Sequence, residues 1–315
     1  MTETLKNLPT LSLAAQDRDP EGFAQAFGDS FRTFGFAVIT DHGVDRALID
    51  KAWEQTRLLF ELPEEVKRSY YTSDLAGQRG YTPFGTEIAK DADHVDLKEF
   101  WHVGRDLPAG HRFRDHMPDN IWPAELPAFE AIFTNMYAAF DRAGNQLLSA
   151  IARYLGLAPD WFADKVDHGN SVMRLLHYPP IPADAPGIRA GAHGDINLIT
   201  LLLGAEEGGL QLLTRQGDWL SIAPPEGALV INVGDMLERL TNNQLPSTIH
   251  RVLNPPPERR HIPRYSMPFF LHLASDVLIE TLPGCIDADH PNLYPSPITA
   301  NDFLVQRLIE IGLKT

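Results

Sequence analysis

The chain has 315 residues, of which 43% are hydrophobic and 22% charged, so it is long enough and apolar enough to bury a substantial core. Its 27 basic and 42 acidic residues give a net charge of −15, which repels nucleic-acid backbones and anionic lipid surfaces. We therefore expect no nucleic-acid or membrane partner, although a local basic pocket for a small anion is compatible with this charge.

The first part of the chain is predicted to mix helices and strands. Its N-terminal residues lack the apolar core of a signal peptide, so we expect a cytoplasmic protein. A helix is expected from about Glu21, and the run FAVIT at 36–40 predicts a short buried strand. The sequence DHG at 41–43 then predicts the turn that ends this strand.

Two helical segments and a long loop are predicted next. A helix is expected from about Asp45 to Leu62, because Pro63 stops it. Residues 71–95 are rich in Gly, Asp and Thr and predict a long loop, which in a compact domain is often a functional lid. Residues 124–156 carry apolar side chains at helical spacing, which predicts one long scaffold helix or two abutting helices.

From Ser171 onward the pattern changes to short strands separated by turn residues, which is typical of a sandwich or barrel. Residues 216–218 predict a hairpin turn, and residues 299–313 predict a capped C-terminal helix. The apolar run at 198–203 is too short to cross a bilayer, and the single Cys285 allows no intramolecular disulfide. The expected strands are 171–178, 195–203, 209–214, 218–222, 228–233, 249–253 and 264–274.

Two separated segments carry candidate metal ligands. His193 and Asp195 stand two residues apart at the start of a predicted strand, so their side chains are expected on one face, with the small Gly194 between them. A second predicted strand contributes His250. Two histidines and one carboxylate form the facial triad of non-haem iron(II) oxygenases, which leaves coordination positions open for a co-substrate and dioxygen.

A third segment carries a candidate anion site. Arg264 and Ser266 share one face of the last predicted strand. A guanidinium and a hydroxyl in this arrangement can bind one carboxylate, with the arginine supplying a bidentate pair. The distal carboxylate of 2-oxoglutarate fits such a pair beside a metal.

Taken together, the motifs of the chain resemble the isopenicillin N synthase-like branch of the iron(II)/2-oxoglutarate-dependent oxygenases. The resemblance covers nearly the whole sequence. It rests on the N-terminal motifs LPTLSL (8–13), GFAVITDHGV (35–44) and FELPEEVK (60–67), and on the later motifs NVGD (232–235), TN (241–242), STIHRV (247–252) and RYSMPFF (264–270).

This resemblance implies an α+β fold: a double-stranded β-helix, or jelly roll, with flanking helices and an N-terminal α/β cap region. We accordingly expect an N-terminal region at 1–120 and a catalytic domain at 121–315 that contains the long scaffold helix, the jelly roll and the C-terminal helix. It also implies that iron(II) is bound by three side chains and 2-oxoglutarate by two, namely His193, Asp195 and His250 for the metal and Arg264 and Ser266 for the co-substrate.

The resemblance extends to Tyr178, which matches a tyrosine that often hydrogen-bonds the co-substrate in the family. The chain departs from the family at Leu176, where Asn is common, which removes one polar contact to 2-oxoglutarate. It also departs at Asn243, where Gly is common. Since both residues tolerate a positive φ, we expect the turn there to survive.

The function that follows is that of an iron(II)- and 2-oxoglutarate-dependent dioxygenase, which oxidises a small molecule with dioxygen and releases succinate and CO2. Hydroxylation is the expected outcome. One alternative is an oxidase of the same branch that uses no 2-oxoglutarate and turns its Arg-X-Ser pair to another anion. A second is a non-catalytic ligand-binding module, and a third is a zinc hydrolase with the same ligands.

Candidate substrate residues follow from strand alternation. Arg174 shares a face with Leu176 and Tyr178, while Phe270 and His272 share a face with Arg264 and Ser266. Equivalent positions line the substrate cavity in the family. If Arg174 contacts the substrate, a substrate with an acidic or carbonyl group is favoured, whereas the alternatives are a surface charge at Arg174 and a core side chain at Phe270.

Overall fold

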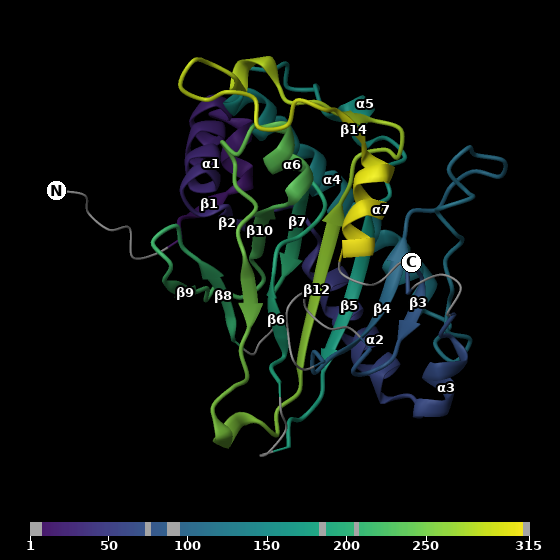
Figure 1. Ribbon diagram of the computed structural model, residues 1–315. Coiled ribbons are helices and arrows are strands. Elements are labelled where there is room, and N and C mark those ends of the chain that lie inside the picture. Colours follow the sequence, from purple (N-terminus) through teal and green to yellow (C-terminus); the bar gives the residue numbers. More distant parts are fainter. Residues whose placement is uncertain (1–7, 73–76, 87–94, 183–186, 205–207, 311–315) are drawn as a thin grey trace.

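Two β-sheets form the framework of the chain, for which the computed structural model describes residues 8–72, 77–86, 95–182, 187–204 and 208–310. The larger sheet has the strand order β1-β2-β10-β7-β12-β5-β4-β3, and the smaller has the order β6-β11-β8-β9. A two-stranded sheet of β13 (Leu278–Ile279) and β14 (Ile298–Thr299) lies near the C-terminus. The strands of the larger sheet run side by side across the width of the molecule (Figure 1).

Strands β5 to β12 form the jelly roll, because the chain passes back and forth between the two sheets. Apolar side chains of both sheets meet in one core cluster, so the sheets face each other. The predicted jelly-roll fold is confirmed. The larger sheet contributes β5 (Val172–Tyr178), β7 (Ile199–Leu203), β10 (Leu229–Val233) and β12 (Arg264–Leu271), and the smaller contributes β6 (Ala190–His193), β8 (Leu210–Leu213), β9 (Trp219–Ser221) and β11 (His250–Val252).

The N-terminal strands extend the larger sheet on both sides. Strands β1 (Thr10–Ser12) and β2 (Phe36–Thr40) add to β10, whereas β3 (Gly80–Thr82) and β4 (Glu99–Gly104) add to β5. β4 pairs with β5 along its whole length, from Glu99 opposite His177 to Gly104 opposite Val172. The N-terminal part of the chain therefore shares one sheet with the jelly roll and supplies a wall next to β5.

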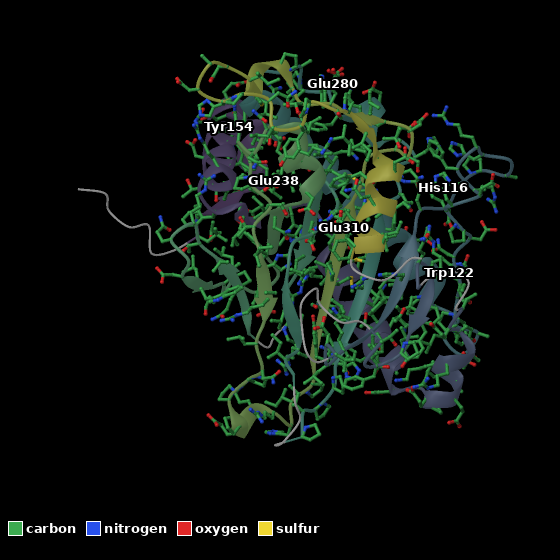
Figure 2. The ribbon with its side chains drawn as sticks, viewed as in Figure 1. His116, Trp122, Tyr154, Glu238, Glu280 and Glu310 are labelled. Carbon is green, nitrogen blue, oxygen red and sulfur yellow. The ribbon has the colours of Figure 1, made fainter. Side chains whose placement is uncertain are left out.

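Helices surround this framework. Helix α4 contacts β7 and β12 of the larger sheet, and α1 and α2 contact α4 in turn. Gly28 permits the close contact of α1 with α4, because a Cβ there would meet the ring of Tyr154 (Figure 2). The helices are α1 (Pro20–Phe34), α2 (Arg46–Glu61), α3 (Glu64–Ser69), α4 (Phe129–Tyr154), α5 (Ala163–Val166), α6 (Asp235–Leu240) and α7 (Ala300–Glu310), with 3-10 turns at Leu13–Asp17, Pro257–Arg259 and Pro283–Cys285.

Local signals explain the helix ends that the sequence predicts. α1 begins after Asp19, whose carboxylate accepts a hydrogen bond from the Gly22 N–H, with Pro20 in the first turn. It ends at Gly35, which adopts a φ of 66° and donates its N–H to the Phe31 carbonyl. This left-handed residue turns the chain directly into β2.

The structure also differs from the sequence predictions. The predicted strand at 195–203 is wrong in its first half, because only β7 is a strand there. α3 and β4 were not predicted, and the predicted loop at 71–95 contains β3; its residues 73–76 and 87–94 lie outside the described part. Among the described residues, no helix is both long enough and apolar enough to span a membrane.

Candidate functional site

Three candidate metal ligands meet at one end of the jelly roll. The ligand atoms of His193, Asp195 and His250 lie within 4.8 Å of one another, and in the described part of the chain no other group of three such side chains does so. Asp195 Oδ1 lies 3.9 Å from the Nε2 atom of each histidine. This geometry places two imidazole nitrogens and one carboxylate oxygen around a common point.

Asp195 reaches this point from the connection between two strands rather than from a strand. β6 ends at His193, and Asp195 lies just before the bend at 196–198 that leads into β7. The expectation that strand alternation aligns the two side chains is therefore wrong, although they do converge. The reason is that His193 pairs with His250 across β6 and β11, and the chain must leave β6 there to cross to the larger sheet.

Backbone carbonyls orient both histidines. The Nδ1 atom of His193 lies 2.8 Å from the Gly191 carbonyl, and that of His250 lies 3.2 Å from the Thr248 carbonyl. Because a carbonyl only accepts, Nδ1 carries the proton in each ring and Nε2 presents a lone pair. The pKa of His193 is lowered to about 4, mainly by burial and to a smaller extent by the neighbouring His250. This ligand is therefore neutral near pH 7.

Two donors fix the carboxylate of Asp195. Its Oδ2 accepts hydrogen bonds from Thr200 Oγ1 at 2.5 Å and from Asn232 Nδ2 at 2.8 Å, which leaves Oδ1 toward the histidines. Burial raises the pKa of Asp195, but the two histidines and these hydrogen bonds outweigh it and lower the pKa overall. The sequence analysis assigned no role to Thr200 or Asn232, although Asn232 belongs to the NVGD motif.

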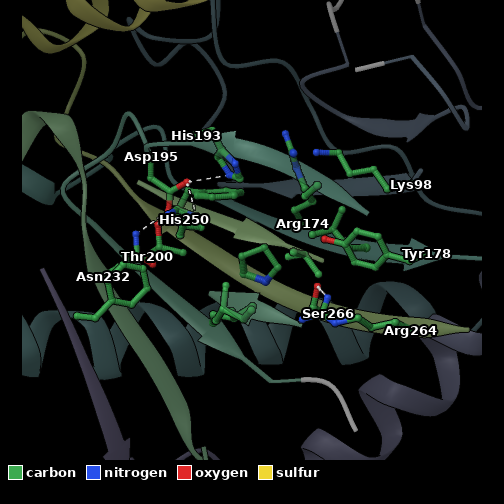
Figure 3. Close-up of a pocket in the computed structure, with 18 residues that line it drawn as sticks. Lys98, Arg174, Tyr178, His193, Asp195, Thr200, Asn232, His250, Arg264 and Ser266 are labelled. Carbon is green, nitrogen blue, oxygen red and sulfur yellow. Dashed lines mark hydrogen bonds and ion pairs between the residues drawn. The ribbon is translucent and has the colours of Figure 1, made fainter. Parts of the chain in front are cut away.

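The candidate anion site lies on β12 at the other end of the same pocket (Figure 3). Arg264 and Ser266 are both buried, and Arg264 Nη1 donates to Ser266 Oγ at 3.2 Å. In the β5–β12 register, Arg264 stands opposite Tyr178 and Ser266 opposite Leu176, and the guanidinium lies 5.0 Å from the Tyr178 ring centroid. The structure therefore groups these residues as the sequence predicts.

The pocket that joins the two ends is bounded by both sheets and has about 570 Å³ of space between the protein atoms, counting space open to solvent. Leu176, which stands where the family commonly has Asn, makes the wall next to Ser266 apolar. The apolar side chains that line the pocket are Phe36, Leu176, Ala190, Leu202, Leu210, Val252, Pro268 and Phe270.

The predicted substrate residues fall in two places. Arg174 and Phe270 line the pocket, together with Lys98, which the sequence analysis did not single out. His272 follows the end of β12, is buried, and is absent from the pocket lining. Burial lowers the pKa of His272 to about 4. The substrate role of all three residues that were predicted stays a prediction.

A buried polar cluster lies on the other face of β4 and β5. The carboxylate of Glu99 contacts Lys67 Nζ at 2.7 Å and His177 Nδ1 at 2.7 Å, and it accepts a hydrogen bond from the Tyr81 hydroxyl. Although burial raises the pKa of Glu99, these three partners lower it overall. The cluster therefore ties α3 and β3 to the strand that carries Arg174 and Tyr178.

Asn243, where the family commonly has Gly, adopts a φ of 62°, and Asn242 beside it adopts 52°. The turn after α6 is therefore formed with two asparagines in the left-handed region, as expected. Asn242 Nδ2 donates to the Cys285 carbonyl at 3.0 Å and to the Pro291 carbonyl at 3.1 Å, which anchors the C-terminal segment to this turn.

Two protein families match the chain. The family described as the N-terminal region of non-haem dioxygenases in morphine synthesis matches residues 8–125, and the 2OG-Fe(II) oxygenase superfamily matches residues 169–273. The second match contains all three candidate metal ligands and both residues of the candidate anion site.

Individual relatives support these matches. The chain is 33% identical over 283 residues to a 2-oxoglutarate-Fe(II) type oxidoreductase of Emericella nidulans, covering 86% of this chain and 79% of that protein. A crystal structure of a protein from Caulobacter crescentus assigned to the 2OG-Fe(II) oxygenase family is 60% identical, with a TM-score of 0.91 over 96% of this chain and 99% of the other. A full-length protein of Neurospora crassa, crystallised in complex with alpha-KG and thymine, is 28% identical, with a TM-score of 0.86 over 98% of each chain.

Proposed function

Since the chain belongs to the 2OG-Fe(II) oxygenase superfamily, we propose that it binds iron(II) through His193, Asp195 and His250 and 2-oxoglutarate through Arg264, Ser266 and Tyr178. The family and its relatives show an iron(II)- and 2-oxoglutarate-dependent dioxygenase that acts on a small molecule. Our residue assignments place this activity in the pocket between the two sheets. The single observation that supports them is the convergence of the three ligand atoms within 4.8 Å.

The donor set fits iron(II). Two imidazoles and one carboxylate would hold the metal and leave positions open for other ligands, which distinguishes this set from a closed structural zinc site. The two hydrogen bonds to Asp195 Oδ2 favour binding through Oδ1 alone. Bound iron(II) would supply dioxygen activation coupled to the decarboxylation of 2-oxoglutarate, which yields succinate and CO2.

The remaining residues position the co-substrate and exclude water. In this proposal the Arg264 fork and the Ser266 hydroxyl bind the distal carboxylate, and Tyr178 lies against them as a further donor. Because Leu176 has no polar group, the co-substrate depends more strongly on Arg264 and Ser266. The apolar side chains around the pocket limit the water near the reacting carbon, which favours hydroxylation of an apolar C–H group.

Two of the alternatives make different predictions. A 2-oxoglutarate-independent oxidase would consume dioxygen without forming succinate. A non-catalytic module would bind 2-oxoglutarate without turnover. We favour the dioxygenase because the three ligands and the anion pair occur together in one pocket. A relative that matches this chain over most of its length is also a 2-oxoglutarate-Fe(II) type oxidoreductase.

The test measures both binding and turnover. Anaerobic addition of iron(II) and 2-oxoglutarate to the protein should produce a weak visible charge-transfer band, and aerobic incubation should release succinate slowly even without substrate. His250→Gln should abolish both signals. The matched variant His290→Gln, which changes a histidine that is 62% exposed and paired with Asp287, should retain them. Retention of both signals in His250→Gln would remove that histidine from the proposed site.

A further inference from the structure

Helix α6 binds both chain segments that carry the proposed metal ligands. At its first residue, the Asp235 N–H donates to the Asp195 carbonyl at 2.7 Å. Further along the helix, the Glu238 carboxylate accepts the Ser247 N–H at 2.7 Å, three residues before His250. One short helix therefore joins the segment of the first two ligands to the segment of the third.

The side chain of Asp235 lies beside Gly194, in the middle of the ligand segment at 193–195. A Cβ at Gly194 would lie 3.4 Å from Asp235 Oδ1 and 3.2 Å from Ser247 Oγ, so this carboxylate lies close to the backbone of the segment. The like charge of Asp195 repels the carboxylate. A cation is therefore needed to hold a largely buried Asp235 in this place.

Arg307 of the C-terminal helix α7 supplies that cation. Its Nη2 lies 3.1 Å from Asp235 Oδ2, and the two side chains are only 28% and 18% exposed. Its Nη1 lies 2.5 Å from Glu310 Oε2, about one turn further along α7, which fixes the guanidinium from its own helix. The ion pair therefore connects α7 to α6, which lies next to it (Figure 1).

We infer that Arg307 is a positioning residue for the metal site: through Asp235 and α6 it holds the two ligand segments together, so that docking of α7 and binding of iron(II) are coupled. This inference rests on the proposed function, because it takes the triad as the iron site. Coupling between two binding events is reciprocal. If docked α7 raises the affinity for iron(II) by some factor, bound iron(II) must stabilise docked α7 by the same factor.

The first test measures the affinity for iron(II) by anaerobic competition against a chromophoric chelator. Arg307→Gln removes the charge and should weaken binding about fivefold or more, whereas Arg307→Lys keeps the charge and should stay close to wild type. The matched control is Arg153→Gln, because Arg153 is 27% exposed and joins α4 to Glu21 of α1 through an ion pair at 2.6 Å. Wild-type affinity in Arg307→Gln would refute the inference, and so would an equal loss in Arg153→Gln or in Arg307→Lys.

A double-mutant cycle tests the route through Asp235. Asp235→Asn should also weaken iron(II) binding, and its combination with Arg307→Gln should be no weaker than the weaker single variant, because both changes break the same ion pair. Urea unfolding of the metal-free proteins is measured alongside. A merely structural pair would lower the free energy of unfolding in the Arg307 and Arg153 variants alike and leave iron(II) affinity unchanged. Additive losses of affinity in the cycle would reject the route through Asp235.

The reciprocal effect is measured on the wild-type protein, so it does not depend on the folding of a variant. Hydrogen exchange of the amides of α7 at 304–310 is followed anaerobically with and without iron(II). Bound iron(II) should slow this exchange about fivefold or more in wild type, and by less in Arg307→Gln. Exchange in α7 that iron(II) leaves unchanged would overturn the inference.

Failure of the proposed function gives a different result. Wild-type protein that binds no iron(II), or whose iron(II) binding survives His250→Gln, would refute the metal site itself. Wild-type binding that His250→Gln abolishes, together with unchanged affinity in Arg307→Gln, would retain the proposed function and reject only the role of α7.

Discussion

The Thr200→Val variant tests whether the residues behind the triad set its affinity for iron. Thr200 is buried and supplies one of the two hydrogen bonds to Asp195 Oδ2. Valine keeps the shape of threonine and replaces its hydroxyl with a methyl group. Loss of a hydrogen bond to a charged group costs about 1.5–3 kcal/mol. Asn232 remains, so we expect the lower half of this range.

For the metal, the same loss corresponds to roughly 10- to 100-fold weaker binding, because side chains behind metal ligands commonly contribute that much. The measurement is anaerobic competition for iron(II) against a chromophoric chelator. Thr200→Ser keeps a hydroxyl and should stay close to wild type. Thr56→Val, which removes a buried hydroxyl that donates to the Ala52 carbonyl within α2, should leave iron affinity unchanged. Wild-type affinity in Thr200→Val would show that Asn232 alone orients the carboxylate.

Three further predictions address other parts of the chain. Arg264→Lys should raise the KM for 2-oxoglutarate about tenfold or more, because lysine cannot replace the bidentate fork, and steady-state succinate assays measure this. Glu99→Gln should lower the free energy of unfolding by up to about 3–5 kcal/mol in urea, because buried Lys67 then keeps only the half-exposed Glu64 at 3.3 Å as a carboxylate partner; an effect below 1 kcal/mol would contradict this. The pKa of His272 is about 4 in the folded protein and 6.5 in its ordinary state. As pH falls, the unfolded chain therefore takes up a proton at this residue before the folded protein does. The metal-free protein should lose stability as pH falls from 6.5 to 4. His272→Gln should reduce that loss by up to about 3 kcal/mol, as measured by urea unfolding at each pH.

Elements with local signals were predictable from the sequence. α1 has its cap at Asp19 and its left-handed end at Gly35, and β2 follows as an uninterrupted apolar run. The hairpin turn at Gly217, which has a φ of 89°, joins β8 and β9 where the turn residues predicted it. In each case the residues that determine the element lie within it or next to it.

β4 was missed because its stability comes from distant partners. Its sequence contains Glu99 and His102, which do not suggest a strand buried along its whole length. The carboxylate is matched by Lys67 from α3, and the imidazole by Arg174 from β5. Neither partner is near in sequence, so no local pattern reveals that these polar groups can be buried.

The identities of the site residues were predictable, but part of their geometry was not. His193, Asp195 and His250 were found from residue type and motif, whereas strand alternation gave the wrong reason for their convergence. Asp195 is held instead by Thr200 and Asn232 from β7 and β10. These two strands are neighbours in the larger sheet, a relationship that only the strand order reveals.

The net charge of the whole chain and the net charge of the pocket lining have opposite signs. The whole chain is acidic, which argues against long polyanions on its surface. The pocket has the reverse balance, since Lys98, Arg174 and Arg264 line it while Asp195 is the only acidic side chain in its described lining. Iron(II) would offset Asp195 and add one further positive charge. A pocket of this kind favours small anions that fit between its walls.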